Sequence, residues 1–315
     1  MIINLFDVVN RYRDVNLDVA TAPSIKERSF ESSLISGLFN EIYVFGDSLS
    51  DIGNAFDATR KGFKEGLPPA PPYIQGRFSN GAIWVEYLAQ LLGLTSKRKT
   101  NYAIGGANTG NTNTFIPNNP LNLPGLQQQF TSFKTQYPQA DREALYIIWA
   151  GANDYLSGSL QDSTQAIANL SNGVKLLATL GAKNIMVVNL PDLGKLPATR
   201  QDPQVSKFLS DITQKHNSGL AESLKALSQS LGNCVNIIQF DVYSLFNQVF
   251  ASPQKFGFTV VTNSELEQLS QLQGYTEEFF FWDDIHPTTA VHKLLAKYAF
   301  EVLSAKNKLY LLVEN

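Results

Sequence analysis

Ser48 is the first residue in the chain whose setting could support covalent chemistry. It follows an apolar run over residues 42–45 and the pair Gly46-Asp47. A turn at the end of a strand exposes such a side chain and aims the next amides at a bound carbonyl oxygen. A serine hydroxyl becomes a useful nucleophile only when a neighbouring base takes its proton. Taken alone, the segment is equally compatible with a helix cap formed by Asp47 or Ser48.

His286 is the candidate for that base. Asp283 precedes it by three residues and Pro287 follows it. In a tight turn, this spacing lets the carboxylate reach Nδ1 of the imidazole while Nε2 faces the serine. Asp284 is the rival acid, and it ranks second because a side chain two residues away points in a different direction in such a turn. The competing interpretation is a helix-start turn in which an aspartate is a cap and the histidine has no catalytic part.

Two glycine-rich turns supply candidates for stabilising a negatively charged oxygen. Acyl transfer needs donors aimed at the oxyanion that develops on the carbonyl. The N–H of Gly106 can approach a ligand closely because glycine lacks a Cβ atom. The side-chain amide of Asn153 and the N–H of Ser48 are the other candidate donors. Taken alone, the Gly-x-Asn-Asp segment around Asn153 is more typical of a plain turn.

Short apolar runs alternate with amphipathic stretches from residue 41 onward, which predicts an α/β domain with a parallel sheet covered on both faces. Three predicted strands end in the polar turns that carry Ser48, Gly106 and Asn153. In such sheets the ligand site lies at the carboxyl ends of the strands, so we expect these side chains to converge. The expected strands cover residues 42–45, 101–104, 145–149, 185–188 and 235–238, and the expected helices 82–92, 126–137, 166–180, 203–231 and 287–305.

Composition and charge argue against several other functions. The 315 residues carry a net charge of −3, whereas a nucleic-acid binder usually has a basic excess, so no nucleic-acid partner is expected. No His/Cys group has the spacing of a zinc site, so no metal is expected. His216 and His292 lie in helical stretches with no acid three residues earlier, which favours a structural role. The single Cys234 cannot form an internal disulfide, and we expect it to be a buried thiol.

Residues 1–40 are interpreted as an extension and residues 41–315 as the main domain. The extension carries apolar residues partly at helical spacing, namely Ile2, Ile3, Phe6, Val9 and Tyr12. This pattern predicts a short amphipathic helix that packs on the domain or on another chain. Peripheral membrane contact is the alternative, although the polar face is not rich in Lys or Arg. No secretory signal or transmembrane stretch is evident, which favours a cytoplasmic location, with secretion as the alternative if a leader has been removed. The oligomeric state is left open.

Two long segments without helix or strand signals, residues 61–81 and 110–124, are predicted to be loops. Loops of this length inside a domain often act as lids or binding walls. Both carry apolar side chains that could line a groove for an acyl chain. These are Phe63, Leu67 and Tyr73 in the first loop and Phe115, Ile116 and Leu123 in the second.

Four blocks of the sequence, in the same order, resemble the GDSL esterase/lipase family of the SGNH hydrolase superfamily. The matching positions are residues 46–54 (GDSLSDIGN), Gly106, Asn153 within Gly-x-Asn-Asp, and residues 283–287 (DDIHP). Residues 76–81 and 124–129 further resemble the branch that contains plant-type lipases and thermolabile-hemolysin-like lipases. The resemblance extends over residues 41–305.

The resemblance implies a three-layer α/β/α, flavodoxin-like fold with a central parallel sheet and a two-step acyl-enzyme mechanism without metal or organic cofactor. It implies that Ser48, His286 and Asp283 are catalytic, and that Ser48, Gly106 and Asn153 form the oxyanion hole. The implied substrates are carboxylic esters, foremost acyl lipids or other medium-to-long acyl esters. A carbohydrate O-acetylesterase is the alternative within the superfamily, and a non-catalytic binding module is the alternative outside enzymes.

Overall fold

A parallel sheet of four strands forms the centre of the computed structural model, which describes residues 3–13, 37–269 and 278–313. The strand order is β1-β2-β3-β4, and one continuous row of partners runs through Val44, Ile147, Met186 and Ile238. The strands are β1 (Ile42–Gly46), β2 (Leu145–Trp149), β3 (Asn184–Val188) and β4 (Asn236–Phe240). All four are predicted from the sequence within two residues, because runs of buried aliphatic and aromatic residues end at turn residues.

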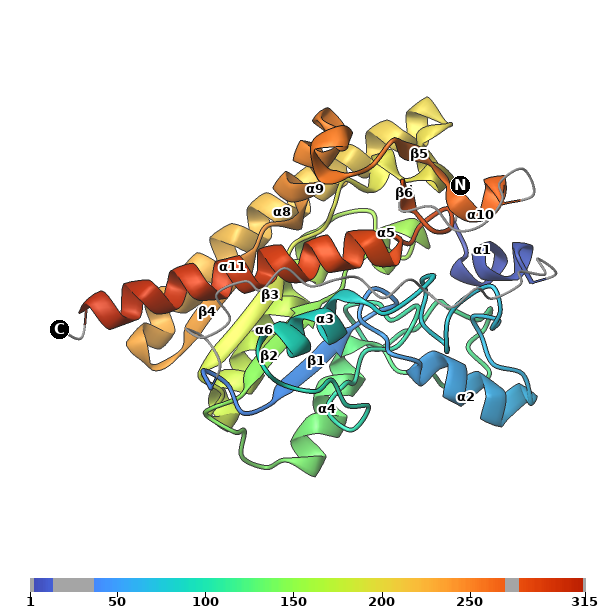
Figure 1. Ribbon diagram of the computed structural model, residues 1–315. Coiled ribbons are helices and arrows are strands. Elements are labelled where there is room, and N and C mark those ends of the chain that lie inside the picture. The colour runs from blue at the N-terminus through green and yellow to red at the C-terminus, as the bar shows by residue number, and fades with distance from the viewer. Residues whose placement is uncertain (1–2, 14–36, 270–277, 314–315) are drawn as a thin grey trace.

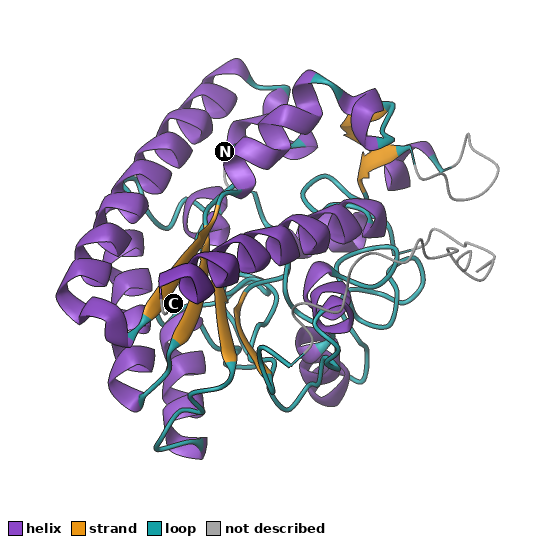
Figure 2. Ribbon diagram, turned by 60° about the vertical axis from the view of Figure 1, so that its left-hand side comes forward, coloured by secondary structure: helices purple, strands orange, loops and turns teal. Residues whose placement is uncertain are grey.

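Helices cover both faces of this sheet, so the domain has three layers, as Figures 1 and 2 show. Alternate strand residues point to opposite faces, with Val44 in one apolar cluster and Phe45 in the other. The face of Val44 packs against α3 (Trp84–Leu91), α9 (Val242–Ala251) and α11 (Thr289–Val313). The face of Phe45 packs against α4 (Leu126–Gln136), α6 (Thr164–Leu180) and α8 (Pro203–Leu231).

Residues 101–104, expected to be a strand, lie beside β1 without forming a regular one. The N–H of Tyr102 donates to the carbonyl of Val44 at 2.7 Å, in parallel orientation. The ladder is interrupted because the N–H of Gly46 donates to the side chain of Gln129 at 2.9 Å instead of to the carbonyl of Tyr102. With this segment counted as the second strand of the chain, the order is 2-1-3-4-5, which is the flavodoxin-like arrangement.

Shorter elements gather around the carboxyl end of the sheet. The sequence reading leaves most of them unassigned because each spans ten residues or fewer and carries little periodic signal. In Figure 1, α1, α2, α5 and α10 lie at this end of the molecule. The elements are α1 (Leu5–Arg11), α2 (Asn54–Phe63), α5 (Ala152–Leu156), α7 (Pro197–Arg200), α10 (Glu265–Gln268) and the parallel pair β5 (Val260–Ser264) and β6 (Phe279–Phe281).

Helix α1 is the short helix predicted for the N-terminal extension, and it packs on the main domain. Its buried residues Leu5 and Val9, together with Tyr12, belong to an apolar cluster that includes side chains from both long loops. The N–H of Ile3 donates to the carbonyl of Leu156 at 2.8 Å, which attaches the start of α1 to α5. Ile2, which the sequence pattern places in the same helix, lies outside the described residues.

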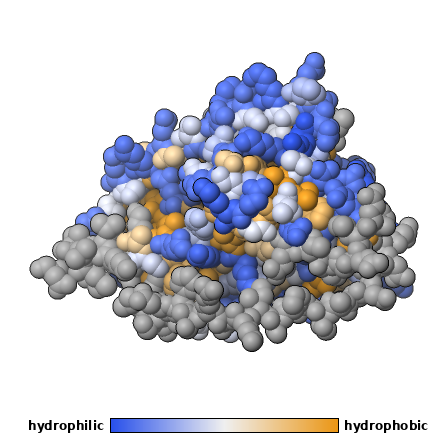
Figure 3. Space-filling model, turned by 45° about the horizontal axis from the view of Figure 1, so that its top comes forward, coloured by the Kyte–Doolittle hydropathy of each residue, from blue (hydrophilic) through white to orange (hydrophobic). Residues whose placement is uncertain are grey.

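Cys234 is exposed, contrary to the expectation of a buried thiol. It lies in a single 3-10 turn, Gly232–Cys234, where the chain passes over the surface from α8 to β4. The face drawn in Figure 3 is covered largely by hydrophilic side chains. Among the large apolar side chains of the described residues, Phe63 and Phe208 are exposed, at 45% and 41%. None of the described helices combines the length and apolar content needed to span a bilayer.

Candidate active site

Ser48, His286 and Asp283 form a continuous chain of hydrogen bonds beyond the carboxyl end of the sheet. The Oγ atom of Ser48 lies 2.9 Å from Nε2 of His286, and Nδ1 of His286 lies 2.7 Å from Oδ2 of Asp283. The exposed fractions of the three residues are 6%, 0% and 0%. A hydroxyl, an imidazole and an orienting carboxylate within hydrogen-bond reach are the groups needed to activate a serine.

The turn that carries His286 holds the Asp283 carboxylate from both sides. Oδ1 accepts the backbone N–H groups of Ile285 at 2.8 Å and His286 at 2.7 Å. Oδ2 accepts the hydroxyl of Tyr73 at 2.7 Å in addition to the imidazole. Burial acts to raise the pKa of Asp283, but the charge of His286 and these hydrogen bonds outweigh it, so the pKa lies below its usual value. Asp283 is therefore ionised at neutral pH.

Asp284 points away from the imidazole, toward the N-terminal helix. It forms an ion pair with Arg11, and it accepts the hydroxyls of Tyr12 at 3.1 Å and Ser264 at 3.3 Å. Burial and the adjacent Asp283 raise the pKa of Asp284, although Arg11 acts in the opposite direction. The structure thus separates the two aspartates that compete in the sequence, because only Asp283 reaches the imidazole.

Buried carboxyl groups shape the turn that carries Ser48. Asp47 accepts the N–H of Leu49 at 3.1 Å, and burial raises the pKa of Asp47 to about 7. Asp51 accepts four backbone N–H groups, one of them from Gly105 at 2.9 Å. Burial raises the pKa of Asp51 to about 6 despite these bonds. Asp51 therefore joins the serine turn to the neighbouring glycine turn.

Gly106 occupies a backbone conformation that only glycine adopts easily. Its φ is +76°, and a Cβ atom at this position would lie 2.3 Å from the backbone nitrogen of Phe115. The carbonyl of Gly106 accepts the N–H of Thr114 at 2.9 Å, which fixes the turn. No hydrogen bond between described residues takes up the N–H of Ser48 or of Gly106. Both groups are thus available to a ligand oxygen.

Asn153 presents its side-chain amide to the same place from the first turn of α5. Its Nδ2 atom lies 3.2 Å from the carbonyl of Ala107 and 3.4 Å from Oδ2 of Asp47. Both contacts are long, as is common for catalytic hydrogen bonds before a substrate binds. The next residue, Asp154, accepts the N–H and the hydroxyl of Thr109 at 2.9 and 2.7 Å. The turns after β1, after residues 101–104 and after β2 are therefore bonded to one another.

The apolar residues expected to line an acyl groove form a packed cluster instead. Except for the exposed Phe63, they are at least 94% buried, and they share this cluster with Leu5, Val9 and Tyr12. The groove prediction fails for this arrangement because the loop side chains pack against one another and against the N-terminal helix. Phe78 of the first loop packs against the His286 ring, with centroids 5.1 Å apart.

The other two histidines are buried within the fold, as expected. Burial lowers the pKa of His216 to about 4 and that of His292 to about 3. Nδ1 of His216 lies 2.7 Å from the hydroxyl of Tyr155. Across residues 3–13, 37–269 and 278–313, no group of three or more His, Cys, Asp or Glu side chains could hold a metal ion.

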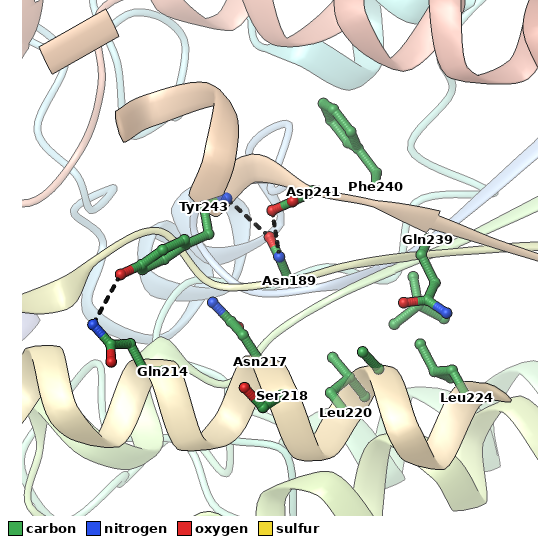
Figure 4. Close-up of a pocket in the computed structure, with 12 residues that line it drawn as sticks. Asn189, Gln214, Asn217, Ser218, Leu220, Leu224, Gln239, Phe240, Asp241 and Tyr243 are labelled. Carbon is green, nitrogen blue, oxygen red and sulfur yellow. Dashed lines mark hydrogen bonds between the residues drawn. The ribbon is translucent and has the colours of Figure 1, made fainter. Parts of the chain in front are cut away.

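A hollow of about 560 Å³ lies elsewhere, between α8 and the ends of β3 and β4 (Figure 4). Its polar side chains bond mainly to one another. Asn189 donates to Asp241 at 2.7 Å and accepts the N–H of Tyr243 at 3.0 Å, while Gln214 donates to the Tyr243 hydroxyl at 3.2 Å. It has no pair of nucleophile and base, so we place the candidate active site at Ser48.

Sequence reasoning missed Tyr73 and Asp51 as parts of this site. Asp51 had a signal, because it lies in the same motif block as Ser48, GDSLSD. Tyr73 had none that points to Asp283, because 210 residues separate the two. Its apolar neighbours suggested a wall for a substrate instead.

Comparisons with known proteins identify the family of the chain. The model of the family of GDSL-like lipases and acylhydrolases matches residues 42–299. The chain is 30% identical to phosphatidylcholine-sterol acyltransferase of Aeromonas hydrophila, over 83% of this chain and 89% of that protein. It is 29% identical to thermolabile hemolysin of Vibrio parahaemolyticus, over 83% of this chain and 63% of that protein. A solved lipolytic G-D-S-L protein of Veillonella parvula shares 18% identity, with a TM-score of 0.44, over 83% and 97% of the two chains.

Proposed function

This chain belongs to the family of GDSL-like lipases and acylhydrolases and is a carboxylic ester hydrolase, and from this premise we propose that it hydrolyses acyl-lipid or other medium-to-long acyl esters through an acyl-enzyme on Ser48. The observation that carries the proposal is the buried hydrogen-bond chain from Ser48 through His286 to Asp283. Its parts match the roles of nucleophile, base and orienting acid.

The proposed reaction has two steps that use the same groups. In the first, the Ser48 oxygen attacks the ester carbonyl carbon while His286 Nε2 takes the hydroxyl proton. The negative charge that develops on the carbonyl oxygen is held by the N–H groups of Ser48 and Gly106 and by the Asn153 amide. His286 then gives its proton to the departing alcohol oxygen. In the second step, His286 takes a proton from water, which attacks the acyl-enzyme carbonyl carbon. The bond to the Ser48 oxygen then breaks, His286 returns its proton to that oxygen, and the acid is released.

Asp283 supports both steps without taking part in bond breaking. Its carboxylate keeps the proton of neutral His286 on Nδ1, so that Nε2 can accept one from Ser48. It then stabilises the imidazolium that forms. Because Asp283 is buried and ionised, its charge acts on His286 with little screening by water.

The preference for acyl lipids is the finer part of the proposal. It draws on the similarity to the phosphatidylcholine-sterol acyltransferase of Aeromonas and the thermolabile hemolysin of Vibrio. One observation favours a second candidate, an esterase for short acyl groups such as an O-acetylated carbohydrate. Ser48 is only 6% exposed, and a small acyl group is the easiest to accommodate at so closed a centre.

Hydrolysis of p-nitrophenyl esters from acetate to palmitate tests the proposal. We expect Ser48→Ala to reduce turnover by at least about 10³-fold at every chain length, because the nucleophile is lost. Ser132→Ala, at an exposed position on α4, is the matched control and should retain wild-type rates. A preference for long chains supports the acyl-lipid proposal, whereas a preference for acetate favours the second candidate. Turnover that survives in Ser48→Ala contradicts the mechanism.

A further inference from the structure

Tyr73 donates to the Asp283 oxygen that faces the catalytic imidazole. Its hydroxyl lies 2.7 Å from Oδ2, and the His286 Nδ1 atom lies 2.7 Å from the same oxygen. The other carboxylate oxygen is occupied by two backbone N–H groups of the turn. Oδ2 is therefore shared between the imidazole and one side chain from a distant loop.

The hydroxyl of Tyr73 can act only as a donor to this carboxylate. Burial and the neighbouring Asp283 charge raise the pKa of Tyr73 well above its usual value, so the hydroxyl keeps its proton at neutral pH. An ionised carboxylate has no hydrogen to give in return. Charge-assisted bonds of this kind are stronger than neutral ones.

The surroundings of Tyr73 restrict the position of its ring. Tyr73 is 1% exposed and packs edge-on against Trp282, with centroids 6.2 Å apart and an interplanar angle of 89°. Its N–H donates to the carbonyl of Pro69 at 3.1 Å. Pro71 and Pro72 directly precede it, and proline restricts φ. The hydroxyl therefore meets Oδ2 in a fixed position rather than as one of many rotamers.

We propose that Tyr73 is a positioning residue of the ester hydrolase, which fixes the Asp283 carboxylate against His286 and limits how much of its negative charge acts on the imidazole. The inference rests on the proposed function, because it assigns Tyr73 a part in the same triad. It replaces the sequence-based interpretation of Tyr73 as a wall for the acyl chain.

Removal of the hydroxyl gives this role a distinct kinetic signature. Without the Tyr73 hydroxyl, Oδ2 has one donor fewer in a buried place, so the carboxylate is held less firmly beside Nδ1 and its charge is less dispersed. A carboxylate charge that is less dispersed attracts the positive charge of the imidazolium more strongly, and only the neutral imidazole can act as the base. The acid limb of the profile of kcat/KM against pH should therefore move to higher pH.

Other ionisable groups face the turn that carries Asp283 and His286. The variants that are compared must leave these groups unchanged, because their charges also affect the pH profile. Asp47 and His292 interact electrostatically with His286, and Asp284 and Tyr12 with Asp283. Tyr12→Phe is the matched control, because it removes a tyrosine hydroxyl that donates to the adjacent Asp284 at 3.1 Å. Both variants leave these groups in place except for the hydroxyl that is removed.

The experiment compares Tyr73→Phe and Tyr12→Phe with wild-type enzyme on p-nitrophenyl acetate, with rates normalised to active sites titrated by a fluorophosphonate. We expect Tyr73→Phe to lower kcat about 10-fold, the scale of one charge-assisted hydrogen bond, with KM unchanged and the acid limb at higher pH. Tyr12→Phe should stay within twofold. Phenylalanine keeps the aromatic ring. If Tyr73 only lined the acyl-binding site, Tyr73→Phe would leave kcat, KM and the pH profile unchanged.

Three outcomes would overturn the inference: a wild-type pH profile in Tyr73→Phe, a loss confined to KM, or a loss that disappears after normalisation to active sites. If Tyr73→Phe does not fold, the test moves to Asp283→Glu and Asp283→Asn, where the glutamate should fail to recover activity if a fixed carboxylate position matters. In folded protein, Tyr73→Phe should add little to Asp283→Asn, because the hydroxyl acts through that carboxylate. Absence of Ser48-dependent turnover in wild-type enzyme would instead contradict the proposed function.

Discussion

Asp283 and Asp284 are neighbours in the chain, yet they serve different parts of the molecule. Asp283 faces inward to His286 and Tyr73 and has a lowered pKa. Asp284 faces α1, where it meets Arg11 and Tyr12, and has a raised pKa. Two aspartate side chains thus have pKa shifts in opposite directions because their surroundings and hydrogen-bond partners differ. The comparison teaches that the partners of a carboxylate, more than its place in a motif, decide its role.

The largest effect that tests this division is on turnover. We expect Asp283→Asn to lower kcat by about 10³- to 10⁴-fold, because an amide cannot hold the imidazole in the required tautomer or stabilise its charge. Asp284→Asn should lower kcat less than about 10-fold, since its partners lie on α1. The measurement is kcat on p-nitrophenyl acetate for protein whose fold is verified by circular dichroism. If Asp284→Asn proved the more damaging, the assignment of the acid would be wrong.

A smaller effect concerns the dependence of stability on pH. The lowered pKa of Asp283 contributes stability above its unfolded value near pH 4, and this is lost as the pH falls. The raised pKa of Asp284 acts oppositely, because its contribution is complete below that value and is lost as the pH rises. Urea unfolding between pH 3.5 and pH 7 should therefore show that the cost of Asp283→Asn grows with pH while that of Asp284→Asn shrinks. Parallel curves for the two variants would contradict the opposite pKa shifts.

The smallest effect is expected at Arg11. Its side chain is 60% exposed, so Arg11→Gln should lower the free energy of unfolding by less than about 1 kcal/mol. Activity on p-nitrophenyl acetate should stay within twofold. Lys97→Gln is the matched control, since Lys97 forms a surface ion pair with Glu41 at 2.6 Å at the other end of β1. A tenfold loss of kcat in Arg11→Gln alone would show that the α1 side takes part in catalysis after all.

Local patterns were sufficient to predict the regular layers. Residues 145–149 and the helix after Pro203 follow from periodicity and from turn or cap residues within a few positions. Residues 101–104 deviate because the Gln129 side chain takes the Gly46 N–H that a continued ladder would need. Periodicity does not record such side-chain competition, so the interrupted strand could not be foreseen.

The site likewise has a part that can be predicted from local sequence and a part that cannot. The spacing of Asp283 and His286 is local, and it was enough to rank Asp283 above Asp284. The partners that distinguish the two carboxylates lie more than 200 residues away in the chain, as for Tyr73 with Asp283 and Arg11 with Asp284. One sequence carries no direct sign of such pairings. The contacts between α1 and the two loops are also distant in the chain. The sequence therefore predicts an open groove where the structure has a packed cluster.

The bond between α1 and Asp284 also has a consequence for synthesis of the chain. Arg11 and Asp284 are 273 positions apart, and at about 5–20 residues per second the ribosome needs roughly 14 to 55 s to cover that interval. Until then, the apolar face formed by Leu5 and Val9 has no Trp282 or Leu266 to pack against, although these residues share its cluster in the finished protein. Helix α1 thus leaves the ribosome well before part of the chain that it packs against in the finished protein.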